Sequence, residues 1–223
     1  MNYLFLILSV LCSFGFIVLT RPKKKVGLQL LLAFSGAFLL AITIFELLPE
    51  VYQATDTKTI GVFIMLGILL QIFLEFFSKG AEHGHIHLEV QNKQFPWLLF
   101  ISLCIHALLE GIPVHDNNPI LFGILVHKIP IALILSIFLL TSKIATYKAI
   151  LFITLFSLMT PLGSLVAENL EFVLHYKTPI TALVIGVFFH ISTVILFESS
   201  QGHTFNLRKL LVIILGITFA YFI

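Results

Sequence analysis

Charged residues are scarce in this chain of 223 residues: they make up 11% of it, against 59% hydrophobic residues and a mean hydropathy of +1.07. Soluble domains carry roughly 25% charged residues, so a soluble globular fold is excluded. There are two cysteines, Cys12 and Cys104, both in apolar stretches, and no disulfide framework is expected. The net charge of +2 says little by itself, and no nucleic-acid partner is expected. The expected partner is a lipid bilayer.

Long apolar segments occupy most of the chain. A hydrocarbon core of about 30 Å requires about 20 apolar residues per helix. The predicted spans are Asn2–Thr20, Val26–Leu48, Thr59–Phe77, Phe95–Pro113, Pro119–Leu140, Ala149–Leu170, Pro179–Glu198 and Leu210–Ile223. The sequence therefore predicts an all-α polytopic membrane protein with eight transmembrane helices. Residues 1–223 are expected to form a single transmembrane domain, with one longer polar loop at about 78–94.

The positions of the basic residues predict the orientation of the spans. Ten Lys and Arg residues fall in one set of alternate loops, and two, Lys58 and Lys177, fall in the opposite set. Because basic loops stay in the cytoplasm, both termini are expected outside and the loop at 78–94 inside. The first span has its basic residues after it, the reverse of a secretory signal, so it is expected to remain uncleaved. A bacterial inner (plasma) membrane is the expected location.

The second and seventh spans share a sequence pattern. It comprises Gly36, Phe38, Thr43 and Glu46 in the second span, and Gly186, Phe188, Thr193 and Glu198 in the seventh. These two spans run in opposite directions. Matching patterns on oppositely directed helices suggest an inverted repeat of three spans on each side of a central pair. The central pair would then be the fourth and fifth spans.

Ionisable residues within this central pair are the strongest functional signal. Such residues at membrane depth cost about 2.5–3.5 kcal/mol each on insertion scales, so they are paired, bind something, or both. His106 and Glu110 are four residues apart and lie on one face of a helix. Pro113 and Pro119 bracket a short loop, and His106 and His127 each lie about ten residues from its middle. Both imidazoles are therefore expected roughly 15 Å deep, at one level.

Two imidazoles and a carboxylate form a ligand set that suits zinc or a similar divalent ion. Lys128 follows His127 directly, and its ammonium would stand where a second cation would otherwise bind, which predicts one metal ion rather than two. In the alternative interpretation, His106 and His127 are neutral hydrogen-bond partners between helices, and Glu110 pairs with Lys128. That alternative leaves the matched depth of the two histidines unexplained.

Several motifs follow one another along the chain. They are Leu47-Leu48-Pro49-Glu50, Glu75 with the later Glu82-His83-Gly84-His85, His106 with Glu110-Gly111, His127 with Pro130, and Thr160-Pro161-Leu162-Gly163. In this order and spacing they resemble the ZIP (Zrt/Irt-like) family of divalent metal transporters over essentially the whole chain. The resemblance implies an eight-helix fold divided three-two-three. It also implies transport into the cytoplasm of zinc, or of related ions such as iron, manganese or cadmium.

The chain departs from the family pattern at four positions. Ala107 and Ile131 stand where the family usually has a polar and a metal-binding residue. Lys128 replaces a polar or acidic ligand of many members, and Glu46 stands where a histidine is common. A two-metal site is therefore not expected. A one-metal site would rest on the two histidines and one glutamate of the central pair, with water or another helix completing four-coordination.

Weaker candidates lie outside the central pair. Glu46 and Glu75 are candidates for a vestibule along the metal path, and His190 is expected to make a hydrogen bond between helices in preference to binding metal. The loop at 78–94 is predicted either to capture metal or to be a solvated polar loop. Its candidate ligands are His83, His85 and His87.

The function predicted from these residues is transport, not enzymatic catalysis, with the outer helices rocking against the central pair. An intramembrane zinc hydrolase is an alternative, because two histidines, a carboxylate and an open position also describe catalytic zinc. The sequence lacks a His-Glu-x-x-His motif. A second alternative is a non-transporting metal-binding relative in which Lys128 and Ile131 have disabled the route. A homodimer is a candidate assembly.

Overall fold

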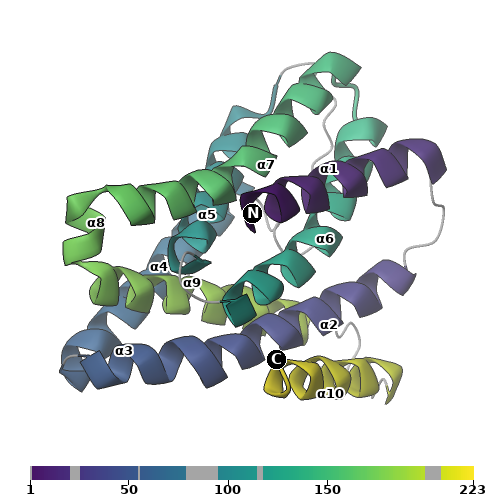
Figure 1. The fold of residues 1–223 in the computed structure, drawn as a ribbon. Coiled ribbons are helices and arrows are strands. Elements are labelled where there is room, and N and C mark those ends of the chain that lie inside the picture. The colour runs from purple at the N-terminus through teal and green to yellow at the C-terminus, as the bar shows by residue number, and fades with distance from the viewer. Residues whose placement is uncertain (1, 21–25, 55, 79–94, 115–117, 199–206) are drawn as a thin grey trace.

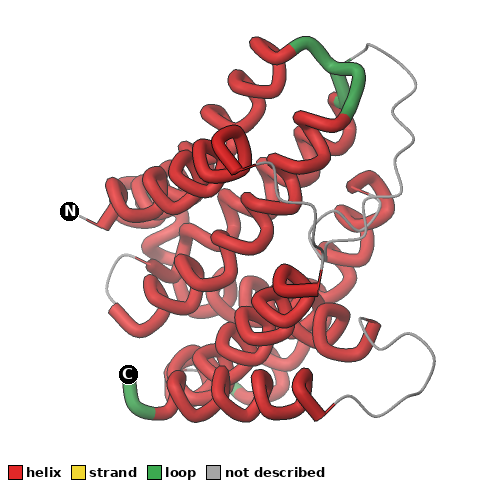
Figure 2. The backbone as a smooth tube through the Cα atoms, turned by 90° about the vertical axis from the view of Figure 1, so that its right-hand side faces the viewer, coloured by secondary structure: helices red, strands yellow, loops and turns green. Residues whose placement is uncertain are grey.

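A computed structural model describes residues 2–20, 26–54, 56–78, 95–114, 118–198 and 207–223. Within these ranges the regular structure is helical throughout (Figures 1 and 2). Seven helical segments are long and apolar enough to cross a membrane. The chain is thus an integral membrane protein, and the predicted all-α polytopic fold class is confirmed.

The helices follow the predicted spans closely. Their bounds are α1 Asn2–Thr20, α2 Val26–Ile42, the π-helix η1 Thr43–Leu47, α3 Leu48–Ala54, α4 Thr57–Ser78, α5 Trp97–Gly111, the 3-10 helix η3 Ile112–Val114, α6 Asn118–Thr141, α7 Thr146–Asn169, α8 Glu171–His175, α9 Lys177–Glu198 and α10 Leu207–Tyr221. The seven membrane-length segments lie in α1, α2 to α3, α4, α5 to η3, α6, α7 and α9. The predicted eighth span corresponds to α10, which has 15 residues.

The long helices pack in two groups. One group is α1, α5, α6 and α7, which share an apolar core that includes Val10, Leu103 and Phe152. In the other, α4 packs against α9, and α10 packs along α2. The lower part of Figure 1 shows α10 beside α2. The groups meet where α2 packs against α6, with Leu32 and Ile131 in a shared apolar cluster, and where α4 packs against α5. The helices α5 and α6 therefore belong to a four-helix group.

Within the first group, α5 and α7 approach each other at backbone distance. A Cβ atom built on Gly163 would lie 1.9 Å from the carbonyl oxygen of Leu108, and one built on Gly111 would lie 2.0 Å from that of Thr160. No side chain fits at such distances. Small residues at helix interfaces allow this close packing in membranes, where the hydrophobic effect does not drive helices together.

A crossing of the same kind joins α4 to α9 in the second group. A Cβ atom on Gly67 would lie 1.9 Å from the carbonyl oxygen of Leu183, and one on Gly186 would lie 2.0 Å from that of Ile64. The Gly67 Cβ would also lie 3.1 Å from the Cα atom of Gly186, so the two glycines face each other. Each helix group thus contains a crossing at which two glycines face each other.

The second span is a single long helix with an irregular turn. The helix α2 continues through η1 into α3, and together they cover the membrane-length segment Gly27–Gln53 (Figure 1). The π-helical turn contains Glu46, which is partly exposed. Such turns recur at functional sites because they insert one extra residue into a helix.

Candidate metal centre

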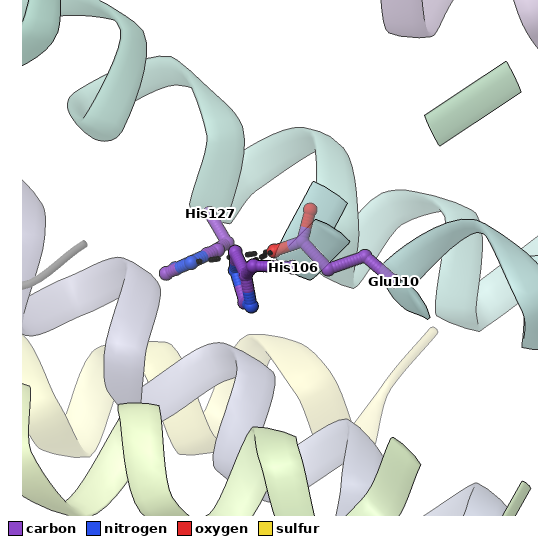
Figure 3. Close-up of side chains that lie close together, drawn as sticks. All are labelled: His106, Glu110 and His127. Atoms are coloured by element: carbon purple, nitrogen blue, oxygen red, sulfur yellow. Dashed lines mark ion pairs between the residues drawn. The ribbon is translucent and has the colours of Figure 1, made fainter. Parts of the chain in front are cut away.

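Three predicted ligands converge between α5 and α6. The Nε2 atom of His106 lies 2.9 Å from Oε1 of Glu110, and Nε2 of His127 lies 3.6 Å from the same oxygen. One ligand atom of each residue lies within 4.8 Å of the others, and Figure 3 shows both imidazoles directed at the carboxylate. All three residues are buried, with 4%, 1% and 1% of their surface exposed for His106, Glu110 and His127.

A lysine contacts the other oxygen of the same carboxylate. The Nζ atom of Lys128 lies 2.8 Å from Oε2 of Glu110 and 4.9 Å from the ring centroid of Phe156. Lys128 is itself only 3% exposed. A buried ion pair needs close geometry because both charges have left water. Oε1 of the carboxylate thus faces the imidazoles, and Oε2 faces the ammonium.

This arrangement bears on the two interpretations of the central residues. The Glu110–Lys128 pair is common to both, so it does not distinguish a metal site from a structural ion pair. A structural pair does not require two imidazoles from different helices to meet at the remaining carboxylate oxygen. The convergence of His106 and His127 on Oε1 is therefore the feature that favours a ligand set.

The backbone beside these ligands is held against α7. Gly111, next to Glu110, lies in the close crossing with α7. One turn earlier, Oγ1 of Thr160 donates a 2.8 Å hydrogen bond to the carbonyl oxygen of Ala107, next to His106. The ligand-bearing face of α5 is thus fixed at both ends by contacts with α7. Ala107, which stands where the family usually has a polar residue, is fully buried in the core of the first group.

The weaker candidates lie elsewhere. His190 makes the predicted contact between helices: its Nε2 atom lies 2.6 Å from Oε2 of Glu75 and links α9 to α4. Glu46 is not part of the described ligand cluster. The loop candidates lie outside the described residues; they are His83, His85 and His87.

Sequence reasoning missed Gln71 in α4. It is completely buried, and neither its Oε1 nor its Nε2 has a hydrogen-bond partner among the described residues. A carboxamide in the middle of an apolar span is a signal that the sequence does contain. It carries no charge, however, so it stands out less than the histidines and glutamates. Which groups surround it depends on which helices pack beside α4, and the sequence does not give that packing.

No protein-family model matches the chain. The protein named Protein zntD from Dictyostelium discoideum is 35% identical over 105 residues, which cover 39% of this chain and 15% of that protein. Zinc transporter ZIP1 from Danio rerio is 32% identical over 90 residues, which cover 38% of this chain and 30% of that protein. The chain thus matches less than a third of the length of either relative. One relative is named as a transporter and neither name denotes an enzyme, in line with the predicted non-enzymatic function. These matches confirm the resemblance to the ZIP family of divalent metal transporters that the order of motifs predicted.

Proposed function

We propose that the chain is a membrane transporter that carries a divalent metal ion into the cytoplasm through one site formed by His106, Glu110 and His127. The convergence of their three ligand atoms within 4.8 Å in a buried position carries the proposal. Two imidazole nitrogens and a carboxylate oxygen are typical zinc ligands, and an open fourth position suits an ion that must enter and leave. Zinc is the favoured cargo, as the name of one relative also suggests. Iron, manganese and cadmium accept the same ligands.

We propose that Lys128 occupies the place of a second ion. Its ammonium lies 2.8 Å from Oε2 of Glu110, so a second divalent cation at that oxygen would be repelled at short range in a medium of low dielectric constant. The same ammonium keeps the carboxylate charged beside the first ion. The site is therefore expected to hold one metal ion at a time.

We further propose that α10 is the eighth span, so that residues 1–223 form one transmembrane domain divided three-two-three with an inverted repeat. The support is its packing along α2, where a Cβ atom on Gly216 would lie 2.8 Å from the carbonyl oxygen of Phe34. With eight spans and ten basic residues against two in alternate loops, both termini lie outside. A bacterial inner membrane and a homodimer complete the proposal.

The packing also suggests how access would alternate. Both ligand-bearing helices belong to the group of α1, α5, α6 and α7, so rocking of the outer helices against α5 and α6 alone would disrupt that group's core. We infer instead that this group moves as a unit against α2, α4, α9 and α10. Where α2 meets α6, the interface contains apolar side chains such as Leu32 and Ile131, which can slide without breaking hydrogen bonds.

The enzymatic alternative gains no support. A zinc hydrolase needs a general base beside the metal, in addition to its ligands. In the described part of the chain, the ligand cluster contains one carboxylate, Glu110, and both imidazoles and Lys128 already contact it.

The proposal is tested by uptake of radioactive zinc into liposomes that contain the purified chain. We expect His106→Ala and Glu110→Ala to abolish uptake, while size-exclusion chromatography shows folded protein. Glu171→Gln, in the exposed helix α8, serves as the matched control and should transport like the unaltered chain. Normal uptake by both site variants would reject this site. Tight zinc binding without uptake by the unaltered chain would favour the non-transporting relative.

A further inference from the structure

A second pair of metal-binding side chains lies between α4 and α9, outside the central site. Oε2 of Glu75 and Nε2 of His190 are 2.6 Å apart. Their side chains are 27% and 15% exposed, in contrast to the buried central ligands. Unlike the central ligands, this pair therefore reaches the protein surface. The proposed central site itself makes no use of the pair.

The buried carboxamide of Gln71 lies on the same face of α4. Gly67, Gln71 and Glu75 are spaced four residues apart, and Gly67 faces Gly186 across the crossing with α9. The Glu75–His190 contact follows this crossing in both helices, so the two helices run in the same direction. Gln71 is one turn beyond Gly67, and His190 is one turn beyond Gly186. Because the two glycines face each other, the backbones of Gln71 and His190 lie at about the same height along the paired helices.

In the described part of the chain, the buried carboxamide of Gln71 lacks a partner, which a bound cation would supply. Its carboxamide is completely buried, and its oxygen and nitrogen have no hydrogen-bond partner among the described residues. Buried polar groups are nearly always satisfied, and the membrane interior offers no water to replace a missing partner. If the Glu75–His190 pair only joined α4 to α9, the buried carboxamide of Gln71, unpartnered within the described ranges, would remain unexplained.

We propose that Glu75, His190 and the carbonyl oxygen of Gln71 form a second site for a divalent cation. The site rests on the proposed transport function, because it would receive the same ion beyond the central site. One imidazole nitrogen, one carboxylate oxygen and one amide oxygen are ligands that zinc, iron and manganese accept. The amide is neutral and a weak ligand, so the ion is held less firmly than at the central site. Glu75 lies in the last turn of α4, before the loop predicted to be cytoplasmic, which suits a station on the way out.

The test counts bound cobalt(II) by its visible absorption in the purified full chain. The histidines of the loop at 83–87 are first replaced by asparagine, so that they do not contribute. We expect two cobalt ions per chain in this background. Glu75→Gln should reduce the number to one, because the amide keeps a polar contact with His190 but removes the charged ligand. Glu171→Gln is the matched control and should keep two.

Further variants separate this site from the central one. With His106→Ala and Glu110→Ala present, one cobalt ion should remain, and adding Glu75→Gln should remove it. Gln71→Leu should weaken binding of the second ion by about tenfold or more, since even an outer partner of a metal ligand is worth about 10–100-fold in affinity. Two ions bound by Glu75→Gln would overturn the proposal. If instead the central variants still bound two ions and Glu75→Gln lost one, the central site would fail and this site would stand.

Discussion

The protein contains two His–Glu contacts of similar length in different settings. His106 and Glu110 lie on one helix with 2.9 Å between Nε2 and Oε1, and both are buried. His190 and Glu75 join two helices across 2.6 Å, and both are partly exposed. The buried carboxylate also contacts His127 and Lys128. The contrast teaches that a His–Glu distance alone says little about metal binding; burial and the number of converging groups are expected to decide how firmly each pair would hold an ion.

The central contact should be the more sensitive of the two, and Glu110→Gln should have the largest effect. It removes the carboxylate that every other group of the site contacts, so zinc uptake should fall to background. It also leaves the Lys128 ammonium buried without its partner, which destabilises a protein by about 3–5 kcal/mol. Thermal unfolding in detergent measures the second effect. The double variant Glu110→Gln, Lys128→Met should regain stability but not uptake. Zinc uptake by either variant would show that the Glu110 carboxylate is not needed for transport.

Lys128→Ala tests the proposal that its ammonium limits the central site to one ion. With the ammonium gone, Oε2 of Glu110 becomes available to a second cation. We expect the central site to bind two ions in place of one when Glu75→Gln is also present to remove the outer site. Calorimetric titration with zinc gives the number. A central site that still binds a single ion would show that Lys128 does not exclude the second.

Each His–Glu contact lies near one of the glycine crossings, so alanine variants at the two crossings can be compared for stability and zinc affinity. Gly163→Ala and Gly186→Ala both place a methyl group within about 2 Å of a carbonyl oxygen, at 1.9 Å and 2.0 Å respectively, so both should lower the unfolding temperature. Only Gly163 lies at the crossing that holds α5 beside Glu110, and only its variant should also weaken zinc binding at the central site. Gly61→Ala, where the added Cβ meets nothing within 4 Å, is the control. Equal loss of zinc affinity in both variants would contradict the claim that only the crossing of α5 with α7 positions the central ligands.

His190→Phe should have a smaller effect. It removes the contact with Glu75 and the imidazole of the proposed outer site, but it leaves the central ligands in place. We expect slower zinc uptake, by a few-fold, with unchanged binding at the central site. Initial rates and equilibrium binding measured on the same preparation separate these quantities. Complete loss of uptake with intact folding would make the outer pair as important as the central one.

Asp56→Ala should have the smallest effect, and it serves as a reference because Asp56 takes part in neither His–Glu contact. The backbone N–H of Thr59 donates to Oδ2 of Asp56 at 2.9 Å, and this bond lowers the pKa of the Asp56 carboxyl. A lowered pKa stabilises the folded chain above the ordinary carboxyl value of about 4, and the benefit disappears as the pH falls through the lowered value. Asp56→Ala should thus lower the unfolding temperature slightly at neutral pH, less so in acid, and leave uptake unchanged. A change in uptake would show that this end of α4 takes part in transport.

The central contact was predictable because it depends on local geometry. A spacing of four residues is sufficient to place His106 and Glu110 on one face of a helix. The short loop between α5 and α6 then brings His127 to the same depth, since each helix rises by a fixed amount per residue. The structure adds which oxygen of Glu110 meets the imidazoles and which meets Lys128.

The outer contact was not predictable, because it depends on which helices lie side by side. Glu75 and His190 are 115 residues apart in sequence. Their meeting follows from the crossing at Gly67 and Gly186, and a glycine in an apolar span does not reveal which helix it will contact. The π-helical turn at Thr43–Leu47 was missed for a related reason, since the extra residue is accommodated by packing around the helix.

X-ray absorption at the zinc edge tests the central site most directly. With one equivalent of zinc bound to the purified chain, we expect two imidazole nitrogens and a carboxylate oxygen at about 2.0–2.2 Å. His127→Ala should reduce the imidazole count to one, while His190→Phe should leave the spectrum unchanged. A zinc shell without imidazole, or one that His127→Ala does not alter, would contradict a metal site between α5 and α6.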